Sequence, residues 1–224
     1  EINNLEKEND QKLDFQGVFD IKKNIKICSK GGIINSIDLL QIADTISASI
    51  RLKKIIFNTD SRPILSSTIN NIVDHTQVEK ILKTGIENSG RISDHASEKL
   101  YELRKSLKSI KAERRKILET FIQRNISYLQ DTTIGDRYGR PVLPIKINYL
   151  NKVKGIIHDS SSSGNTIFIE PEVIISRGNQ IASVNAKISR EEYKLLREWS
   201  NIIRNNEASL FSNSEILLQI ENAL

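Results

Sequence analysis

Histidine, aspartate and serine, the residue types of a hydrolytic triad, stand side by side in GIIHDSSSSGNTIFIEP, residues 155–171. In a triad the histidine takes a proton from the serine hydroxyl while the carboxylate orients the ring, so the three groups must converge in space. His158 and Asp159 are neighbours in a segment typical of a strand, where successive side chains point to opposite faces. The sequence also has no G-x-S-x-G elbow. We therefore expect residues 159–164 to be a hairpin loop whose hydroxyls bond the turn backbone.

The sequence also gives little support for a phosphate-binding loop or a metal site. SSSSGNT has one glycine and no lysine, whereas a phosphate loop follows the pattern G-x-x-x-x-G-K-[ST]. His75, His95 and His158 lie far apart, and none has a second ligand at metal spacing. We expect no catalytic residue, cofactor or metal site in this chain.

After catalysis, phosphate loops and metal sites, the remaining possibility is that the chain binds a charged partner by electrostatic attraction. The net charge of +5 is compatible with a polyanionic partner but does not require one. In the region 131–170 basic residues outnumber the acidic ones, and a β-rich tip with mobile polar loops could grip a nucleic-acid backbone without reading its sequence. The candidate nucleic-acid-binding residues are Arg137, Arg140, Lys146, Lys152, Lys154 and His158. The alternative is a coiled-coil scaffold whose tip binds a protein partner.

Several short helices are predicted before residue 93, after a polar start (1–14) that we expect to be frayed or disordered in part. A short helix should end at the stop signal Gly31-Gly32, and Ser36 is a suitable N-cap for the next helix, which extends to about Ile56. Pro63 restarts the chain, and helices are expected near 63–73 and 76–84. A turn is expected over 84–93, around Asn88-Ser89-Gly90.

The clearest predicted element is a long helix from Asp94 to Gln130, which contains no Gly or Pro. Its apolar residues recur at alternating spacings of four and three, which is typical of a heptad seam. This seam comprises Ala96, Leu100, Leu103, Leu107, Ile110, Ile117 and Phe121, with Arg114 interrupting the series. Basic residues crowd the outer faces of the helix: Lys99, Arg104, Lys105, Lys108, Lys111, Arg115 and Lys116. The simplest interpretation of these charges is that they lie on a solvated helix surface and have no binding role.

A second long helix is predicted from Pro171 or Glu172 to Ser209, with Gly178 as a weak point, and a terminal helix near 213–223 follows. Its apolar positions Ile174, Ile181, Ile188, Leu195 and Ile202 are spaced by seven, and Val184 and Trp199 lie on the same face. Between the two long helices, Gly, Pro and β-branched residues predict three short strands in a small antiparallel sheet. The predicted fold is thus mainly α with a small antiparallel β subdomain, the two long helices packing as an antiparallel coiled coil.

The compartment is predicted from what the sequence lacks. A single Cys28 excludes an internal disulfide framework and suits a reducing compartment. No apolar run approaches the ~18 residues of a membrane span, and no signal-peptide pattern opens the chain. A cytoplasmic protein without membrane association is expected. Because the chain begins at Glu1 and has no methionine, we expect its natural start to lie upstream.

Two adjoining stretches, DRYGRPVLPIK and VKGIIHDSSSSGNTIFIEP, resemble the most recognisable region of the second bacterial MutS family, paralogues of the mismatch-repair MutS proteins. The first stretch matches the family pattern at Gly139, Arg140, Val142, Leu143, Pro144 and Lys146, while Pro141 replaces a bulky residue. The second matches at Gly155, His158, Asp159, Ser161, Gly164, Thr166, Phe168, Glu170 and Pro171. Upstream, GGIINSIDLLQIADTISASIRLKK is similar to the family's Gly-Gly stop and following helix.

This resemblance implies a helical core (1–92), an outgoing lever helix (93–130), a β-rich clamp (131–170) and a returning lever helix with the end of the core (171–224). It also implies an ATPase domain that binds ATP and Mg²⁺, and an Smr endonuclease domain, both outside this chain. Full-length members are implied to form homodimers. Their implied partners are branched or double-stranded DNA, where they suppress recombination, and ribosomal RNA, where they split stalled ribosomes.

Overall fold

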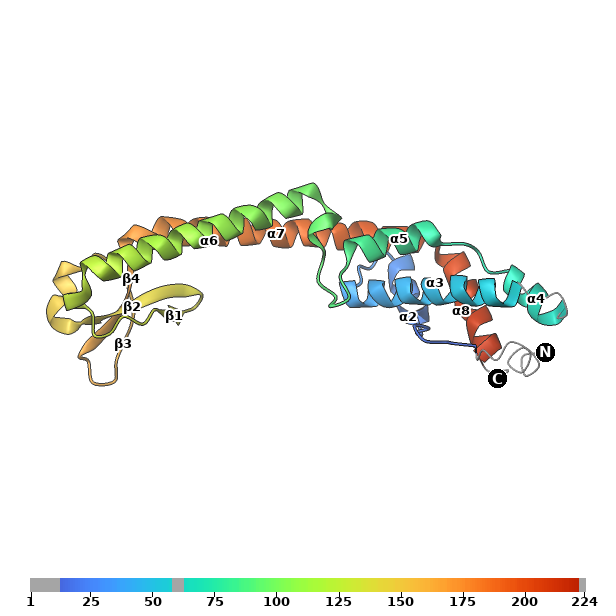
Figure 1. Cartoon of the computed structure of the whole chain (residues 1–224), viewed down its shortest axis with the longest axis horizontal. Helices are drawn as coiled ribbons and strands as arrows, with labels where there is room; N and C mark the ends of the chain where they lie inside the picture. The colour runs from blue at the N-terminus through green and yellow to red at the C-terminus, as the bar shows by residue number, and fades with distance from the viewer. Residues whose placement is uncertain (1–12, 58–62, 222–224) are drawn as a thin grey trace. The chain divides into compact units, whose positions relative to one another are not determined.

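The computed structural model describes residues 13–57 and 63–221, so the expectation for residues 1–14 lies outside the described part of the chain except at Leu13 and Asp14. Leu13 is buried and belongs to the core rather than to a frayed end. The fold is mainly helical with one small antiparallel sheet, as predicted (Figure 1). The chain forms two compact units: Glu1–Leu100 together with Glu191–Leu224, and Tyr101–Arg190. The division into core, levers and clamp is a functional one and stays a prediction.

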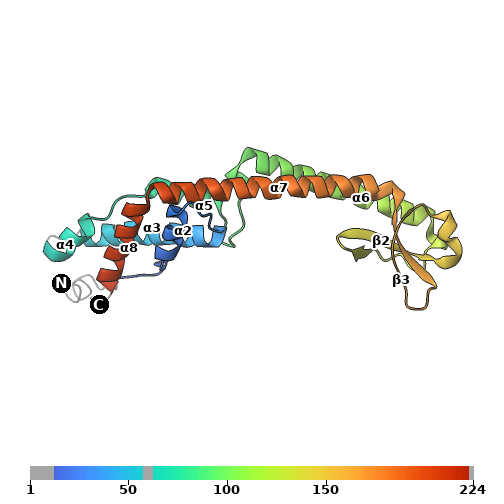
Figure 2. The same cartoon turned by 180° about the vertical axis from the view of Figure 1, so that it is seen from behind.

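The first unit is a cluster of helices. Its shorter helices are α2 (Lys22–Ser29), α4 (Pro63–Asn70), α5 (Thr76–Gly85) and α8 (Glu207–Glu221). Of these, α4, α5 and α8 pack against the longer α3 (Ser36–Phe57). Helix α2 ends at Ser29, and Gly31, just beyond its C-cap, adopts a left-handed φ of 81°, so the predicted stop signal is confirmed. Helix α8 packs against α2 and α3 (Figure 2). These contacts help to bury a cluster of Leu13, Leu52, Ile56, Ile69, Ile72, Ile216, Leu217 and Ile220.

The residue that caps α3 differs from the prediction. The Asn35 side-chain oxygen accepts the backbone N–H of Asp38 at 2.8 Å, which is an N-cap interaction. The Ser36 hydroxyl instead donates to the carbonyl of Gly90 at 2.6 Å. Ser36 therefore ties α3 to the predicted turn, where Ile86 and Ile92 form a β-bridge and Gly90 has a φ of 82°.

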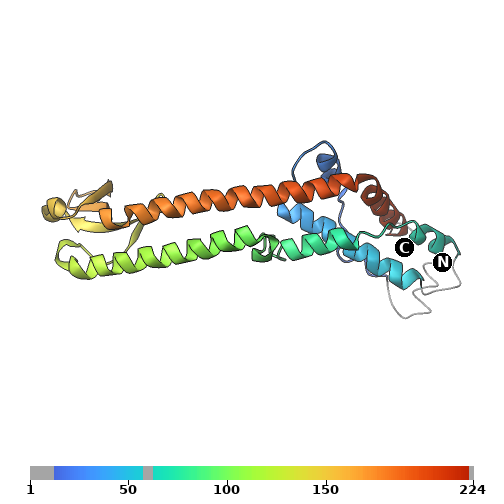
Figure 3. The same ribbon diagram turned by 90° about the horizontal axis from the view of Figure 1, so that it is seen from above.

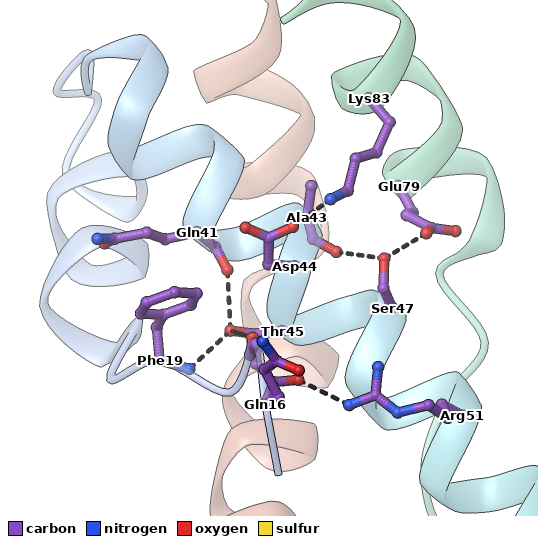
Figure 4. Close-up of polar contacts among 11 residues, drawn as sticks. Gln16, Phe19, Gln41, Ala43, Asp44, Thr45, Ser47, Arg51, Glu79 and Lys83 are labelled. Atoms are coloured by element: carbon purple, nitrogen blue, oxygen red, sulfur yellow. Dashed lines mark hydrogen bonds and ion pairs between the residues drawn. The ribbon is translucent and has the colours of Figure 1, made fainter. Parts of the chain in front are cut away.

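Polar side chains of α3 hold the neighbouring segments (Figure 4). The Thr45 hydroxyl accepts the N–H of Phe19 at 3.1 Å and donates to the carbonyl of Gln41 at 2.8 Å. Arg51 donates to the carbonyl of Gln16 at 2.6 Å. On the other side of α3, Ser47 bonds Glu79 and Asp44 pairs with Lys83, both residues of α5.

Helix α6 spans Glu98–Arg124 and is shorter at both ends than predicted. A 3₁₀ turn occupies Asp94–Ala96, and the Ser97 hydroxyl then caps the helix by accepting the N–H of Leu100 at 3.2 Å. At the far end the Asn125 amide donates to the carbonyl of Phe121 at 2.8 Å. A second 3₁₀ turn (Ile126–Tyr128) follows, after which Leu129 is buried and pairs with the sheet.

Helix α7 spans Glu172–Asn205 and ends before the predicted Ser209. The Asn206 amide donates to the carbonyl of Ile202 at 2.8 Å, and its own carbonyl accepts the N–H of Leu210, so Asn206 separates α7 from α8. The terminal helix therefore starts six residues earlier than expected, at Glu207. Near this end Ile203, rather than the predicted Ile202, is the fully buried residue.

In the second unit, residues 101–124 of α6 and 172–190 of α7 run alongside each other in opposite directions (Figures 1 and 3). Glu113 and Arg177 form an ion pair of 3.1 Å between them. The seam of α7 is buried as predicted, at 8% and 9% exposure for Ile181 and Ile188, whereas the α6 seam residues Leu103, Leu107 and Ile110 are only half-buried.

The sheet of the second unit has four antiparallel strands, one more than predicted, in the order β1-β2-β4-β3. They are β1 (Gly135–Arg137), β2 (Arg140–Lys146), β3 (Gly155–Ser160) and β4 (Thr166–Pro171). The missed strand β1 joins β2 through a tight turn at Tyr138-Gly139, where φ is 54° and 77°. After β2, residues Ile147–Lys152 form a 3₁₀ turn.

Strand β2 lies in the middle of the sheet and changes partner along its length. Its first half pairs with β1, with Val142 opposite Gly135, and its second half pairs with β4, with Leu143 opposite Ile169. Five consecutive residues of β2 are buried. Two of them, Leu143 and Ile145, belong to a core to which α6 and α7 each contribute one residue. This core comprises Leu118, Leu129, Leu143, Ile145, Val153, Ile167, Ile169 and Ile174.

Candidate nucleic-acid interface

Two of the six predicted binding residues, Arg140 and His158, converge on one buried carboxylate. Glu170 on β4 has a side chain only 1% exposed, and its two oxygens face different partners. Arg140 Nη1 lies 3.3 Å from Oε1, and His158 Nε2 lies 3.1 Å from Oε2. His158 is brought inward by an irregularity in β3, because the β3–β4 register shifts between Ile157 and Asp159. These two side chains hold the sheet together rather than facing solvent.

Gly178 explains how Arg140 reaches this position. A Cβ atom at Gly178 would overlap Nη1 of Arg140 and approach Oε1 of Glu170 to 3.2 Å. The guanidinium thus lies against the α7 backbone, and its Nη2 donates to Asn179 Oδ1 at 2.6 Å. Gly178, which was expected to weaken the helix, therefore leaves the space that the Arg140 side chain occupies.

Arg137, the third predicted residue, lies on β1 and is also engaged within the sheet. Its Nε donates to Asp159 Oδ2 at 3.2 Å, and its guanidinium carbon lies 4.4 Å from the centre of the Phe168 ring. This is a cation–π arrangement in which the ring face attracts the positive charge. The arginine therefore joins the edge strands β1 and β3 across β2 and β4.

The three predicted lysines are more open. Lys146 donates to the carbonyl of Ser127 at 3.2 Å, so one of its three N–H groups is used. Lys152 and Lys154 are exposed, and within the described part of the chain no ion pair involves either of them. Of the six candidates, these two lysines offer their charge most directly to a partner.

The serine-rich segment forms the predicted hairpin loop between β3 and β4. The Ser161 hydroxyl accepts the N–H of Thr166 at 3.1 Å, and the N–H of Gly164 bonds the carbonyl of Ser161 at 2.9 Å. Gly164 has a φ of 71°, as such a turn requires. The His158 ring nitrogen that a triad would use is bonded to Glu170 instead of a serine.

An apolar surface lies beside the free edge of β3. Ile156 and Ile157 are 45% and 54% exposed, although both are large and apolar. A hollow of about 540 Å³ adjoins them, lined also by Leu150, Val153 and Ile175. Edge strands with exposed apolar side chains are able to accept a further strand.

The remaining candidates for catalysis or metal binding are Cys28, His75 and any group of metal-binding side chains. Burial raises the pKa of the Cys28 thiol, which keeps it protonated, and burial lowers the pKa of His75. Over residues 13–57 and 63–221, no three His, Cys, Asp or Glu side chains are grouped to hold a metal ion. No helix in these same ranges is long and apolar enough to cross a membrane.

The chain is thus a mainly helical protein in which a small antiparallel sheet is inserted between two long helices, and this sheet carries basic residues. No protein-family model matches the chain. The chain is 30% identical over 223 residues to the endonuclease MutS2 of Synechocystis sp., a match that covers 100% of this chain and 26% of that protein. It is 34% identical over 211 residues to the endonuclease MutS2 of Geobacillus sp., covering 92% and 27% respectively.

The chain is therefore homologous to part of the endonuclease MutS2 proteins, and the resemblance predicted from its motifs is confirmed. It spans about a quarter of the length of the curated relatives that it matches.

Sequence reasoning named Arg140 and His158 but missed that both bind Glu170. The signal was present in part: the buried strand β2 starts with an arginine, and the apolar strand β4 carries one glutamate. Charged residues are almost never fully buried unless paired, so these patterns could have predicted an ion pair between Arg140 and Glu170. The register that brings them together could not be read from the sequence.

Proposed function

We propose that this chain is the core, lever and clamp region of a MutS2-type DNA-binding ATPase, and that it holds nucleic acid by its phosphate backbone. The observation that carries the proposal is the homology along the whole chain to endonuclease MutS2 proteins. It is supported by the order of long helix, sheet and long helix, and by the exposed lysines of the sheet subdomain. Binding is independent of sequence, because lysines contact phosphates as point charges.

In this proposal residues 1–92 form the core, 93–130 and 171–224 supply the levers, and 131–170 form the clamp. ATP and Mg²⁺ bind to an ATPase domain elsewhere in the longer protein, which acts as a cytoplasmic homodimer. The partner is branched or double-stranded DNA, ribosomal RNA in the ribosome, or both. The corresponding roles are suppression of recombination and splitting of stalled ribosomes.

The six clamp residues divide into two groups. We assign Lys152 and Lys154 to direct phosphate contact, because they are exposed. Arg137, Arg140 and His158 position the strands through their bonds to Asp159 and Glu170. Lys146 contributes charge from the end of β2.

A binding assay at low salt tests the proposal, with branched DNA and with ribosomes as separate ligands of the 224-residue chain. The variant Lys152→Glu/Lys154→Glu should weaken binding to at least one ligand and lower the dependence of affinity on salt by about two contacts. Lys54→Glu/Lys80→Glu changes the net charge equally at exposed sites of the first unit and serves as the control. An unmodified chain that binds neither ligand would overturn the proposal.

The second candidate function is a scaffold whose sheet binds a protein partner. The exposed Ile156 and Ile157 beside the hollow favour it. An apolar contact resists about 0.5 M salt, whereas a phosphate contact between exposed charges is screened. Binding of a partner that survives this salt concentration would select the scaffold function.

A further inference from the structure

Helix α6 concentrates the positive charge of the chain. Residues 101–124 contain eight Lys or Arg and three Glu, a formal net charge of +5. The whole chain also has a net charge of +5, so all the other residues together are neutral. Residues 125–171, which include the sheet, hold five basic and four acidic residues and are nearly neutral.

Most of the basic residues of α6 lie on one side of the helix. At about 100° per residue, six of the eight basic side chains fall within an arc of about 140°: the half-buried Arg104 and five others. This arc lies opposite the half-buried seam residues Ile110 and Ile117, and all five side chains are exposed. The basic face of α6 comprises Lys105, Lys108, Lys111, Arg115 and Lys116.

Few of the side chains that the structure describes neutralise this face. Arg115 pairs with Glu119 at 2.8 Å, and the Lys105 ammonium lies 5.8 Å from the centre of the Tyr101 ring. In the described residues no ion pair involves Lys108, Lys111 or Lys116. Like charges three or four residues apart repel and weaken a helix, and Lys108 and Lys111 are such a pair. The basic face therefore opposes the stability of α6, which points to a role in binding.

We propose that the basic face of α6 is the main phosphate-contacting surface of the chain and that its partner is a nucleic-acid duplex. This inference rests on the proposed nucleic-acid binding and moves its principal site from the sheet to the helix. The predicted arginines of the sheet are held by Asp159 and Glu170, whereas the lysines of α6 are open.

The dimensions of the face fit a duplex backbone. Lys105 and Lys116 are about 17 Å apart along the helix axis, at about 1.5 Å per residue. One strand of a duplex carries about five phosphates over that length. Four of the five side chains are lysines, which bind phosphates as point charges and read no bases. Affinity should thus depend on salt and not on sequence.

The test is a titration of fluorescently labelled DNA and RNA duplexes with the 224-residue chain at several salt concentrations. In the variant Lys108→Glu/Lys111→Glu/Lys116→Glu, affinity should fall by about tenfold or more, and the salt slope should decrease by about three. The control Lys23→Glu/Lys54→Glu/Lys80→Glu makes the same change of net charge at exposed sites of the first unit and should bind nearly as the parent chain does. Circular dichroism checks that the helices are retained.

The outcomes separate this inference from the proposed function. If the parent chain binds duplexes and the α6 variant binds equally well, the inference is overturned and the proposed function stands. If the α6 variant and the control lose affinity equally, the effect is one of net charge and the inference is also overturned. If the parent chain binds neither duplexes, branched DNA nor ribosomes, the proposed function itself fails.

Discussion

Glu191 and Glu170 are the two glutamates buried in the described residues, and each is stabilised by a different set of partners. Glu191 on α7 accepts a hydrogen bond from the Ser97 hydroxyl at 3.0 Å and pairs with Lys99 at 2.9 Å. The hydrogen bond from Lys99 is the largest cause that lowers the pKa of the Glu191 carboxyl. The carboxylate therefore fastens the start of α6 to α7.

The Glu191→Gln variant should be less stable than the parent chain at pH 7, by about 1–2 kcal/mol. Because the pKa of Glu191 is lower in the folded state than its ordinary value of 4.5, the stabilisation is present above that value and is lost as the pH falls through the folded pKa. In urea titrations the difference should be smaller near pH 3 than at pH 7. Glu198→Gln, which removes an exposed pair with Lys194, should change little at either pH. A difference that is constant with pH would contradict this account.

The contact between Gly178 and Arg140 makes a second prediction at the residue scale. In an open helix Gly→Ala stabilises by up to about 1 kcal/mol. Here a Cβ atom would displace the guanidinium from Glu170, so Gly178→Ala should instead destabilise by about 1–3 kcal/mol. With Arg140→Ala already in place, the same change should become stabilising. A double-mutant cycle in urea measures this reversal, and an effect of equal sign in both backgrounds would show that Arg140 is not the obstacle.

The identity of the candidate residues could be predicted from the sequence, but their partners could not. Residue types singled out Arg137, Arg140, the lysines and His158, since only such groups attract phosphates. Whether a charge faces solvent depends on the strand register, which places Glu170 beside residues 30 and 12 positions away. The sequence pattern does not contain that register.

Among the elements, the turn between β1 and β2 contains a residue type that is disfavoured in the backbone conformation of the turn. Tyr138 is 97% exposed and has a φ of 54°, a left-handed conformation that Asn adopts more readily than Tyr. Tyr138→Asn should therefore stabilise the chain by about 0.5 kcal/mol, since little packing is lost. Tyr138→Val, with a β-branched side chain, should destabilise it. Thermal unfolding of the two variants tests the order, and a reversed order would refute the turn conformation.

Helices were predicted well because the apolar spacing of 3.6 residues is local information, and α3, α6 and α7 all follow it. Their ends were predicted poorly, because side-chain amides decide them. Asn125 and Asn206 each bond a carbonyl four residues earlier, which ends α6 and α7 before the apolar pattern stops. Strand β1 was missed because Gly135–Arg137 contains no apolar residue and forms only by pairing with β2.

At the scale of the whole molecule, the chain has a separate hydrophobic cluster in each compact unit. Leu52 and Leu143 are both 0% exposed and belong to the clusters of the first and second unit respectively. The single tryptophan, Trp199, is 5% exposed and packs against Gly85, so its fluorescence reports on the first unit. Units with their own cores need not unfold in one transition.

Leu143→Ala should destabilise the second unit by about 2–5 kcal/mol, because it leaves a cavity in a buried strand. Circular dichroism, which detects both units, should then show an earlier transition, while the fluorescence midpoint of Trp199 stays within error of the parent chain. Leu52→Ala, the matched change in the first unit, should shift the fluorescence midpoint instead. If both variants shift both signals together, the continuous helix α7, which contributes residues to both units, couples them into one cooperative structure. The separation of the two signals therefore measures whether the clusters act independently in folding.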